Sequence, residues 1–276
     1  MNVRTLNSNG RLDLEIIDCH LHCGVQNVSW GWERKRPLLT AAGIRGVGLI
    51  PPVEDIYDRY DPEFLDTPAW QACRRRAHQY LLNLREACRS GADDRFEVYP
   101  YFFVWNDFAW EDLGPEYVAI KWHRHPYEPR YQYDHPRCRE FLEAVRQRRL
   151  PILLEESFDN TLFFLERLAP DLPVIIPHLG GLNGGYSPLK AAGVWNRPQT
   201  YADTSTAAPA EMEDFLGRYG SDRLLFGSDH PFGEPQLELA KISTLNLPPD
   251  QARAVLGDNF RRIYGLTSFG CCHLHA

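Results

Sequence analysis

The sequence predicts a single-domain α/β protein built as a (β/α)8 TIM barrel. Short apolar runs rich in β-branched residues alternate with amphipathic segments along the whole chain. Eight such runs can be counted, and each is followed by a helix or a helix-like segment, as parallel β/α units require. The length of 276 residues matches one barrel without a second domain.

The elements follow one another in a regular order. Strands are expected over residues 15–22, 46–50, 96–104, 117–122, 151–154, 172–176, 200–203 and 223–226. Helices are expected over residues 32–42, 70–89, 136–149, 160–168, 188–192, 209–219, 235–244 and 249–264. The clearest helix is 70–89, because its apolar residues recur at helical spacing. Residues 51–67, 105–116 and 123–135 are expected to form loops.

Composition narrows the class of protein. A net charge of −7 and a hydrophobic content of 43% describe a globular chain and argue against nucleic acid as a partner. No apolar run is long enough for a membrane span, and residues 1–12 form a polar segment without a signal-peptide core. We therefore expect a cytoplasmic protein with a barrel domain at 13–267 and a mobile tail at 268–276.

Seven cysteines, an odd number without a Cys-x-x-Cys pair, do not predict a disulfide scaffold. The basic run Arg74-Arg75-Arg76 is interpreted as a solvated helix face.

The first strand ends in a His-x-His motif formed by His20 and His22. Alternate residues of a strand point to the same face, so these imidazoles lie about 6.6 Å apart along the backbone. That spacing lets both rings reach one cation, with bonds of about 2.1 Å. By itself the motif also suits two hydrogen-bonded polar residues at a strand end.

Later strands end in residues of the same chemical kind, and catalytic groups of such barrels lie at the C-terminal ends of strands. The fourth strand leads into Lys121-Trp122-His123-Arg124-His125, the fifth into Glu155-Glu156, the sixth into His178 and the eighth into Asp229. Each motif is weak alone, but their order and placement together predict a metal-dependent site.

These motifs resemble the amidohydrolase superfamily, and in particular the amidohydrolase 2 branch. That branch contains metal-dependent hydrolases, the aminocarboxymuconate-semialdehyde and resorcylate decarboxylases, and related lactonases. The resemblance extends from the opening Ile17-Asp18-Cys19-His20-Leu21-His22 to Gly257-Asp258-Asn259-Phe260-Arg261 near the end of the chain. It implies that His20, His22 and Asp229 bind a divalent ion and that His178 lies beside the water or the substrate.

One position departs from that family pattern. The fifth strand of the family ends in a metal-binding histidine, whereas this chain has Glu155. A carboxylate can still bind a metal, so the expected ligand set is His20, His22, Glu155 and Asp229. The alternative is that Glu155 is a structural carboxylate paired with Lys121 or an arginine. Glu156 should face the opposite side of the strand. The expected ion is zinc, with manganese or iron as alternatives favoured by the extra oxygen ligand.

Residues after the fourth strand are expected to bind the substrate. Lys121 is interpreted as an inward-facing cation for the substrate or for Glu155, rather than as a carbamylated bridge between two ions. His123 and Arg124 complete the predicted substrate-binding set. For His125 and Arg130 an ordinary solvated role is nearly as good an interpretation. Asp203 has equal claims to shaping the pocket and to forming a turn.

The function predicted from these residues is metal-dependent hydrolysis of an amide, ester or lactone bond in a small anionic molecule by a metal-activated water. Asp229 would act as general base, and His178 would polarise the carbonyl. The first alternative is a non-oxidative decarboxylase of an aromatic or unsaturated acid, which tryptophans near the mouth would suit (Trp30, Trp32, Trp105 and Trp122). The second is a metal-independent lactonase or a non-catalytic ligand-binding barrel. A homodimer is considered from analogy only. The Cys-His-Leu-His motif of the C-terminal tail has no assigned role.

Overall fold

Eight parallel strands form one sheet in which every strand pairs with its neighbours in sequence, from β1 to β8. The computed structural model describes residues 15–24, 31–91 and 96–266, so the predicted N-terminal segment and C-terminal tail lie outside the described residues. The strands are β1 (Ile16–His22), β2 (Ile44–Ile50), β3 (Glu97–Phe103), β4 (Ala119–His123), β5 (Ile152–Glu155), β6 (Val174–Ile176), β7 (Thr200–Asp203) and β8 (Leu224–Leu225). The predicted α/β barrel fold is confirmed.

The barrel is closed by the residues that follow β8, because β8 itself is only two residues long. The amide of Cys19 donates to the carbonyl of Phe226 at 2.9 Å. Further along, the amide of Asp229 donates to the carbonyl of His20 at 2.7 Å, and the amide of His22 donates to the carbonyl of His230 at 3.0 Å. These bonds place Asp229 directly beside the two histidines of β1.

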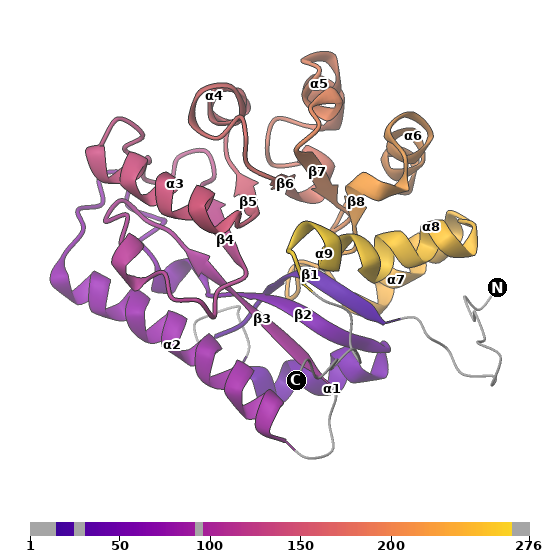
Figure 1. Ribbon diagram of the computed structural model, residues 1–276, viewed down its shortest axis with the longest axis horizontal. Coiled ribbons are helices and arrows are strands. Elements are labelled where there is room, and N and C mark those ends of the chain that lie inside the picture. The colour runs from indigo at the N-terminus through magenta and orange to yellow at the C-terminus, as the bar shows by residue number, and fades with distance from the viewer. Residues whose placement is uncertain (1–14, 25–30, 92–95, 267–276) are drawn as a thin grey trace, which may run out of the picture.

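The helices surround the strands in chain order, from the indigo α1 to the yellow α9 (Figure 1). They are α1 (Trp32–Ala41), α2 (Pro68–Ser90), α3 (Pro136–Arg148), α4 (Phe158–Phe163), α5 (Tyr186–Ala191), α6 (Pro209–Tyr219), α7 (Pro235–Thr244), α8 (Pro249–Arg253) and α9 (Asn259–Ile263). Two expected helices contain π-helical turns, Phe164–Leu168 after α4 and Ala254–Asp258 between α8 and α9. The connection from β3 to β4 has only the short 3-10 turn Trp110–Asp112, so this unit lacks the regular helix of the others.

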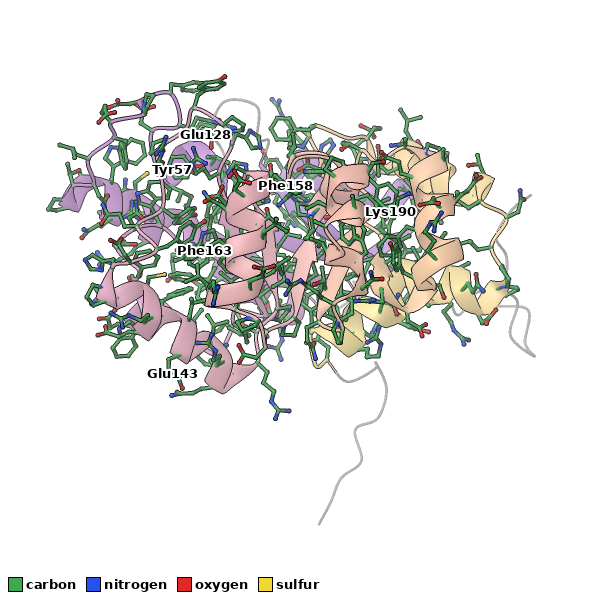
Figure 2. All side chains as sticks on the ribbon, turned by 90° about the horizontal axis from the view of Figure 1, so that it is seen from above. Tyr57, Glu128, Glu143, Phe158, Phe163 and Lys190 are labelled. Carbon is green, nitrogen blue, oxygen red and sulfur yellow. The ribbon has the colours of Figure 1, made fainter. Side chains whose placement is uncertain are left out.

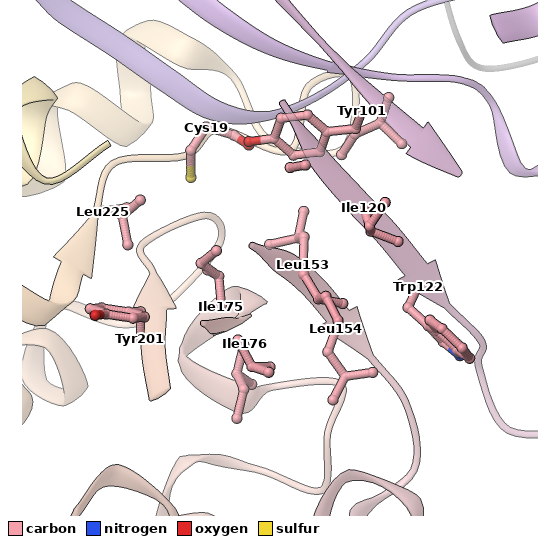
Figure 3. Packing of buried hydrophobic residues seen from close by; sticks show 14 of the residues in the cluster. Cys19, Tyr101, Ile120, Trp122, Leu153, Leu154, Ile175, Ile176, Tyr201 and Leu225 are labelled. Carbon is pink, nitrogen blue, oxygen red and sulfur yellow. The ribbon is translucent and has the colours of Figure 1, made fainter. Parts of the chain in front are cut away.

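Strand alternation divides buried side chains between the helix layer and the barrel interior. Trp122 on β4 is completely buried and packs on the helix side, with its ring centroid 5.0 Å from that of Phe164 and 6.2 Å from that of Phe141. Figure 3 shows Trp122 with the aliphatic residues of the neighbouring strands. Because successive side chains point to opposite faces, Lys121 and His123 are directed into the barrel.

None of the helices in the described residues combines the length and the apolar character that crossing a membrane would require.

The loop between β2 and α2 is fixed by Arg74, contrary to the expectation of a solvated basic run. Only 3% of Arg74 is exposed. Its guanidinium donates to Asp66 at 2.5 Å, to Asp107 at 2.6 Å and to the carbonyl of Ile56 at 2.9 Å. The expectation that all three arginines are solvated is wrong for Arg74 because of its position on the helix. Arg74 faces the loop, whereas its neighbour Arg75 is largely exposed.

We expect Arg74→Met to destabilise the protein by about 3 kcal/mol, because it leaves the partly buried carboxylates of Asp66 and Asp107 without their cation. Arg75→Met is the matched control, and the loss of its exposed pair with Asp112 should cost less than about 1 kcal/mol. Urea denaturation of both variants measures the difference. Equal stabilities would show that Arg74 does not fix the loop.

Candidate active site

A cavity of about 430 Å³ opens at the C-terminal ends of the strands, where the predicted functional residues converge. Its polar lining comes from strand ends and the loops beside them, and includes His22, His123, His125, Glu155, His178 and Asp229. The rest of the wall contains apolar residues, Arg59, Thr206 and Glu211, and its large apolar side chains are Val53, Leu182 and Phe232. The cavity is therefore polar where the strands end and partly apolar elsewhere.

His20, His22 and Asp229 form a compact group of possible metal ligands, as the sequence predicted. The Oδ1 atom of Asp229 lies 3.3 Å from Nε2 of His20 and 3.4 Å from Nε2 of His22. Asp229 adopts a left-handed backbone with a φ of 54°, which turns its side chain back toward β1. His20 is completely buried, and the other two are less than 10% exposed.

Hydrogen bonds fix both histidine rings with Nε2 toward Asp229. The Nδ1 atom of His20 lies 2.9 Å from Oδ2 of Asp203, and Nδ1 of His22 lies 3.3 Å from the carbonyl oxygen of Pro51. Carboxylates and carbonyls only accept, so Nδ1 carries the proton and the neutral ring keeps a lone pair on Nε2. Burial lowers the pKa of His20, and the nearby Lys121 ammonium lowers it further, which favours the neutral ring.

This donor set fits a divalent cation. Two ligand atoms at about 2.1 Å from a tetrahedral ion lie about 3.4 Å from each other, which is the spacing found between Asp229 and both histidines. Two imidazoles and one carboxylate with further positions open suit zinc, iron or manganese in catalytic sites. Asp203 behind His20 supplies the carboxylate–histidine contact that orients such ligands.

Glu155 does not join this group. In the described residues, possible ligand atoms within 4.8 Å of one another form the sets His20/His22/Asp229, His20/Glu155/His178 and His123/His125/Glu155. One oxygen of Glu155 accepts from Nζ of Lys121 at 3.0 Å, and the other accepts from Nε2 of His125 in a short contact. Burial alone would raise the pKa of Glu155, but Lys121, His123 and His125 outweigh it and hold the pKa well below the ordinary value. Glu155 is thus ionised and paired with Lys121, as the alternative interpretation expected, while its role as a metal ligand stays a prediction.

A network of side chains from the loop after β2 supports the far wall of the cavity. The hydroxyl of Tyr57 donates to Glu128 at 2.7 Å and lies 3.1 Å from Nδ1 of His123. Figure 2 shows Tyr57 and Glu128 side by side. Arg59 donates to Glu128 at 2.8 Å and to Nδ1 of His125 at 3.1 Å. Since arginine only donates, this contact places the proton of neutral His125 on Nε2, facing Glu155.

His178 lies between Glu155 and Asp229 on a left-handed turn with a φ of 57°. Its Nε2 atom is 3.7 Å from Glu155 and 3.9 Å from Asp229, while Nδ1 faces the carbonyl of Ser205 at 3.1 Å. Burial lowers the pKa of His178, but Glu155 and the two aspartates outweigh this effect and raise it to about 9. Without a bound cation, the ring is therefore a cationic hydrogen-bond donor at neutral pH.

Of the three predicted substrate-binding residues, only His123 lines this cavity, because Lys121 is completely buried beneath it and Arg124 points elsewhere. Its side chain donates to Glu156 at 3.3 Å and to the carbonyl of Pro129 at 3.2 Å, on the opposite side from His123. Strand alternation continues through this residue, which turns it outward together with Glu156. The expected aromatic mouth also differs, because the described tryptophans at 32, 105 and 122 are buried and do not line the cavity. Trp30 lies outside the described residues.

Sequence reasoning missed Arg59 and its partners Tyr57 and Glu128. Arg59 lines the cavity with 15% of its side chain exposed, although it lies in a loop that carries no recognisable motif. The one available signal was position, since residues 51–67 follow a strand and must run across the catalytic face of the barrel.

We expect Asp203→Asn to weaken zinc binding about 10- to 100-fold, because an amide facing Nδ1 of His20 can donate a proton and favour the wrong tautomer of that ring. Zinc affinity of the metal-free protein, measured by competition with a chelator, checks this. Asp171→Asn removes a surface carboxylate paired with Arg146 and serves as the matched control. An unchanged affinity in the Asp203 variant would contradict the orienting role.

Comparison with solved structures supports the fold. A 2,6-dihydroxybenzoate decarboxylase from Rhizobium superimposes with a TM-score of 0.66 and 16% identity, covering 91% of this chain and 98% of that chain. A candidate 2-pyrone-4,6-dicarboxylic acid hydrolase from Pseudomonas putida gives 0.65 and 16%, with 92% and 98% covered. A dihydroxybenzoic acid decarboxylase from Polaromonas, solved with manganese and 2-nitroresorcinol, gives 0.66 and 14%, with 91% and 97% covered. At these identities the likeness establishes the fold alone.

Sequence comparison establishes the family. No curated protein sequence matches the chain significantly. The model of the amidohydrolase family (Amidohydro_2, described as Amidohydrolase) matches residues 112–266, which is more than half of the chain. The matched region contains β4 to β8 and thus Lys121, Glu155, His178 and Asp229. The protein belongs to this amidohydrolase family of TIM-barrel enzymes.

Proposed function

We propose that the protein is a metal-dependent hydrolase that cleaves an amide, ester or lactone bond in a small anionic molecule. The observation that carries this proposal is the convergence of two Nε2 lone pairs, from His20 and His22, on one oxygen of Asp229. A divalent ion bound by these three residues would supply a Lewis acid that polarises the carbonyl and makes a water molecule more acidic. Zinc is the ion we expect, with manganese or iron as alternatives.

The remaining chemistry falls to residues around that group. Oδ2 of Asp229 faces the cavity side toward His178 and would accept the proton of the attacking water, then return it to the leaving group. Nε2 of His178 would donate a hydrogen bond to the oxygen on which negative charge develops. Glu155 and Lys121 pair with each other, which keeps a buried carboxylate neutralised close to the reacting bond.

Arg59 is the cation of the opposite wall. Nε and Nη2 of Arg59 are engaged by Glu128 and His125, whereas Nη1 has Glu54 at 3.6 Å, beyond hydrogen-bond distance. Nη1 therefore retains N–H groups for a carboxylate of the substrate. Phe232 and Leu182, both partly exposed at the same cavity, offer apolar contact to the rest of a small molecule.

A decarboxylase of an aromatic or unsaturated acid is the second candidate, and His178 favours it. In the site without a bound cation, the pKa of this ring is raised to about 9, and its proton on Nε2 could replace carbon dioxide on the substrate carbon. The reactions named for the structurally similar proteins include both decarboxylation and hydrolysis, so they support either candidate equally.

The proposed function is tested by measuring which reaction products the metal-loaded protein releases from candidate substrates. The zinc-, manganese- and iron-loaded protein is incubated with panels of carboxylated esters, lactones, amides and aromatic acids, and acid release and carbon dioxide are measured. We expect acid release, its loss after chelation, and a decrease of roughly 10²–10⁴-fold in Asp229→Asn, from which the base is removed. Carbon dioxide without acid release would replace hydrolysis by the decarboxylase candidate. Turnover that survives complete metal removal would contradict a metal-dependent reaction.

We expect Arg59→Met to raise KM for anionic substrates at least about tenfold, with a smaller effect on kcat, because it removes the charged donors facing the cavity. The same variant assayed on a methyl ester of the substrate carboxylate is the control, and its KM should change little. Equal losses on charged and uncharged substrates would show that Arg59 acts through the shape of its loop instead.

A further inference from the structure

Lys121 is a buried cation at the edge of the proposed metal group. Its side chain has no exposed surface. The Nζ atom lies 3.2 Å from Nε2 of His20 and 3.0 Å from Oε2 of Glu155. An ammonium group can only donate, so His20 and Glu155 are both acceptors in these contacts.

The contact with His20 uses the atom that a metal ion would need. Because Nδ1 of His20 donates to Asp203, Nε2 is the only acceptor of the neutral ring. That nitrogen has one lone pair, and Nζ of Lys121 and Oδ1 of Asp229 both lie close to it, at 3.2 Å and 3.3 Å. A single lone pair cannot accept a hydrogen bond from Lys121 and coordinate a cation at the same time.

We propose that Lys121 competes with the divalent ion for Nε2 of His20 and so weakens the hold of this centre on its ion. The proposal rests on the metal site of the proposed function. Glu155 makes the competition reversible, because an ammonium that leaves His20 keeps its salt bridge with Oε2 and is not left unpaired in the interior. The positive charge of Lys121 also stays near the cation in a poorly solvated region, which opposes binding further.

The shared donor gives Lys121 a second effect. His20 is common to the His20/His22/Asp229 set and the His20/Glu155/His178 set. Lys121 contacts two members of the latter, His20 and Glu155, and already neutralises its carboxylate. Lys121 is therefore expected to disfavour a second ion at the His20/Glu155/His178 set.

The decisive variant is Lys121→Met, which keeps an unbranched side chain of similar length but removes the charge and the N–H donors. We expect metal-free full-length Lys121→Met to bind zinc at least tenfold more tightly than the parent, measured by chelator competition and calorimetry. Lys190→Met is the matched control. Lys190 lies on α5, where it pairs with Asp214 at 2.8 Å, and it is labelled in Figure 2. This control makes the same change in net charge and should leave zinc affinity within twofold of the parent.

A double variant separates competition from recruitment of Glu155. If the loss of Lys121 tightens binding only because Glu155 becomes a ligand, Lys121→Met/Glu155→Gln will return to the parent affinity, and the proposal is overturned. Binding that stays at least tenfold tighter in the double variant supports competition for His20. An unchanged or weaker affinity in a folded Lys121→Met protein, verified by circular dichroism, also overturns it.

A measurement on the unsubstituted chain keeps the proposal testable if Lys121→Met does not fold. The ¹⁵N resonance of the Lys121 ammonium is followed while zinc is added. A shift complete at one equivalent supports displacement from His20, and an unmoved resonance in zinc-loaded protein overturns it. If parent and variant both fail to bind zinc, the competition and the metal-dependent hydrolase fall together. If both bind zinc equally, only the competition falls.

Discussion

The three backbone hydrogen bonds between β1 and the residues after β8 are the constraint on which this structure depends. They close a barrel whose last strand is too short to close it alone, and one of them joins the amide of Asp229 to the carbonyl of His20. The same hydrogen bonds that close the barrel therefore also position Asp229 beside His20. His20 and Asp229, more than 200 residues apart in the chain, become neighbours only because the sheet returns to its first strand.

Several buried, charged side chains lie around these hydrogen bonds and are paired with one another. Asp203, Asp229 and Glu155 are ionised carboxylates in the interior, each held by donors: histidines, the Lys121 ammonium and backbone amides. Asp203 is bound most completely, since it accepts from His20, from the amide of His178 and from Ser205. Removal of one partner from such a network is costly, whereas the intact network orients every ring that faces the cavity. The hydrogen bonds to Nδ1 of His20 and His22 leave Nε2 of each ring free of a proton, as a metal ligand requires.

Glu155 stands where the resemblance to the family implies a metal-binding histidine. A histidine in that place could not form a salt bridge with Lys121, whereas Glu155 forms one and accepts from His125 as well. The consequence is that the Lys121 ammonium lies against Nε2 of His20, the atom that the proposed divalent ion would also need. The loop that carries Tyr57 and Arg59 forms the cavity wall beside His123 and His125. Arg74 fixes this loop by donating a hydrogen bond to the carbonyl of Ile56.

The sequence by itself determined the barrel and most of the groups that line its mouth. Period-two alternation and strand ends are local properties, so they predicted His20, His22, Glu155, His178 and Asp229 at one face and separated Glu155 from Glu156. The same alternation, applied one residue beyond β4, would also have turned Arg124 away from His123. Only the tertiary structure decided which acceptor each cation meets. Three features depend on distances between segments that are remote in sequence, and no local pattern encodes those distances. They are the pairing of Lys121 with His20 and Glu155, the tautomer of His20 set by Asp203, and the position of Arg59 at the cavity.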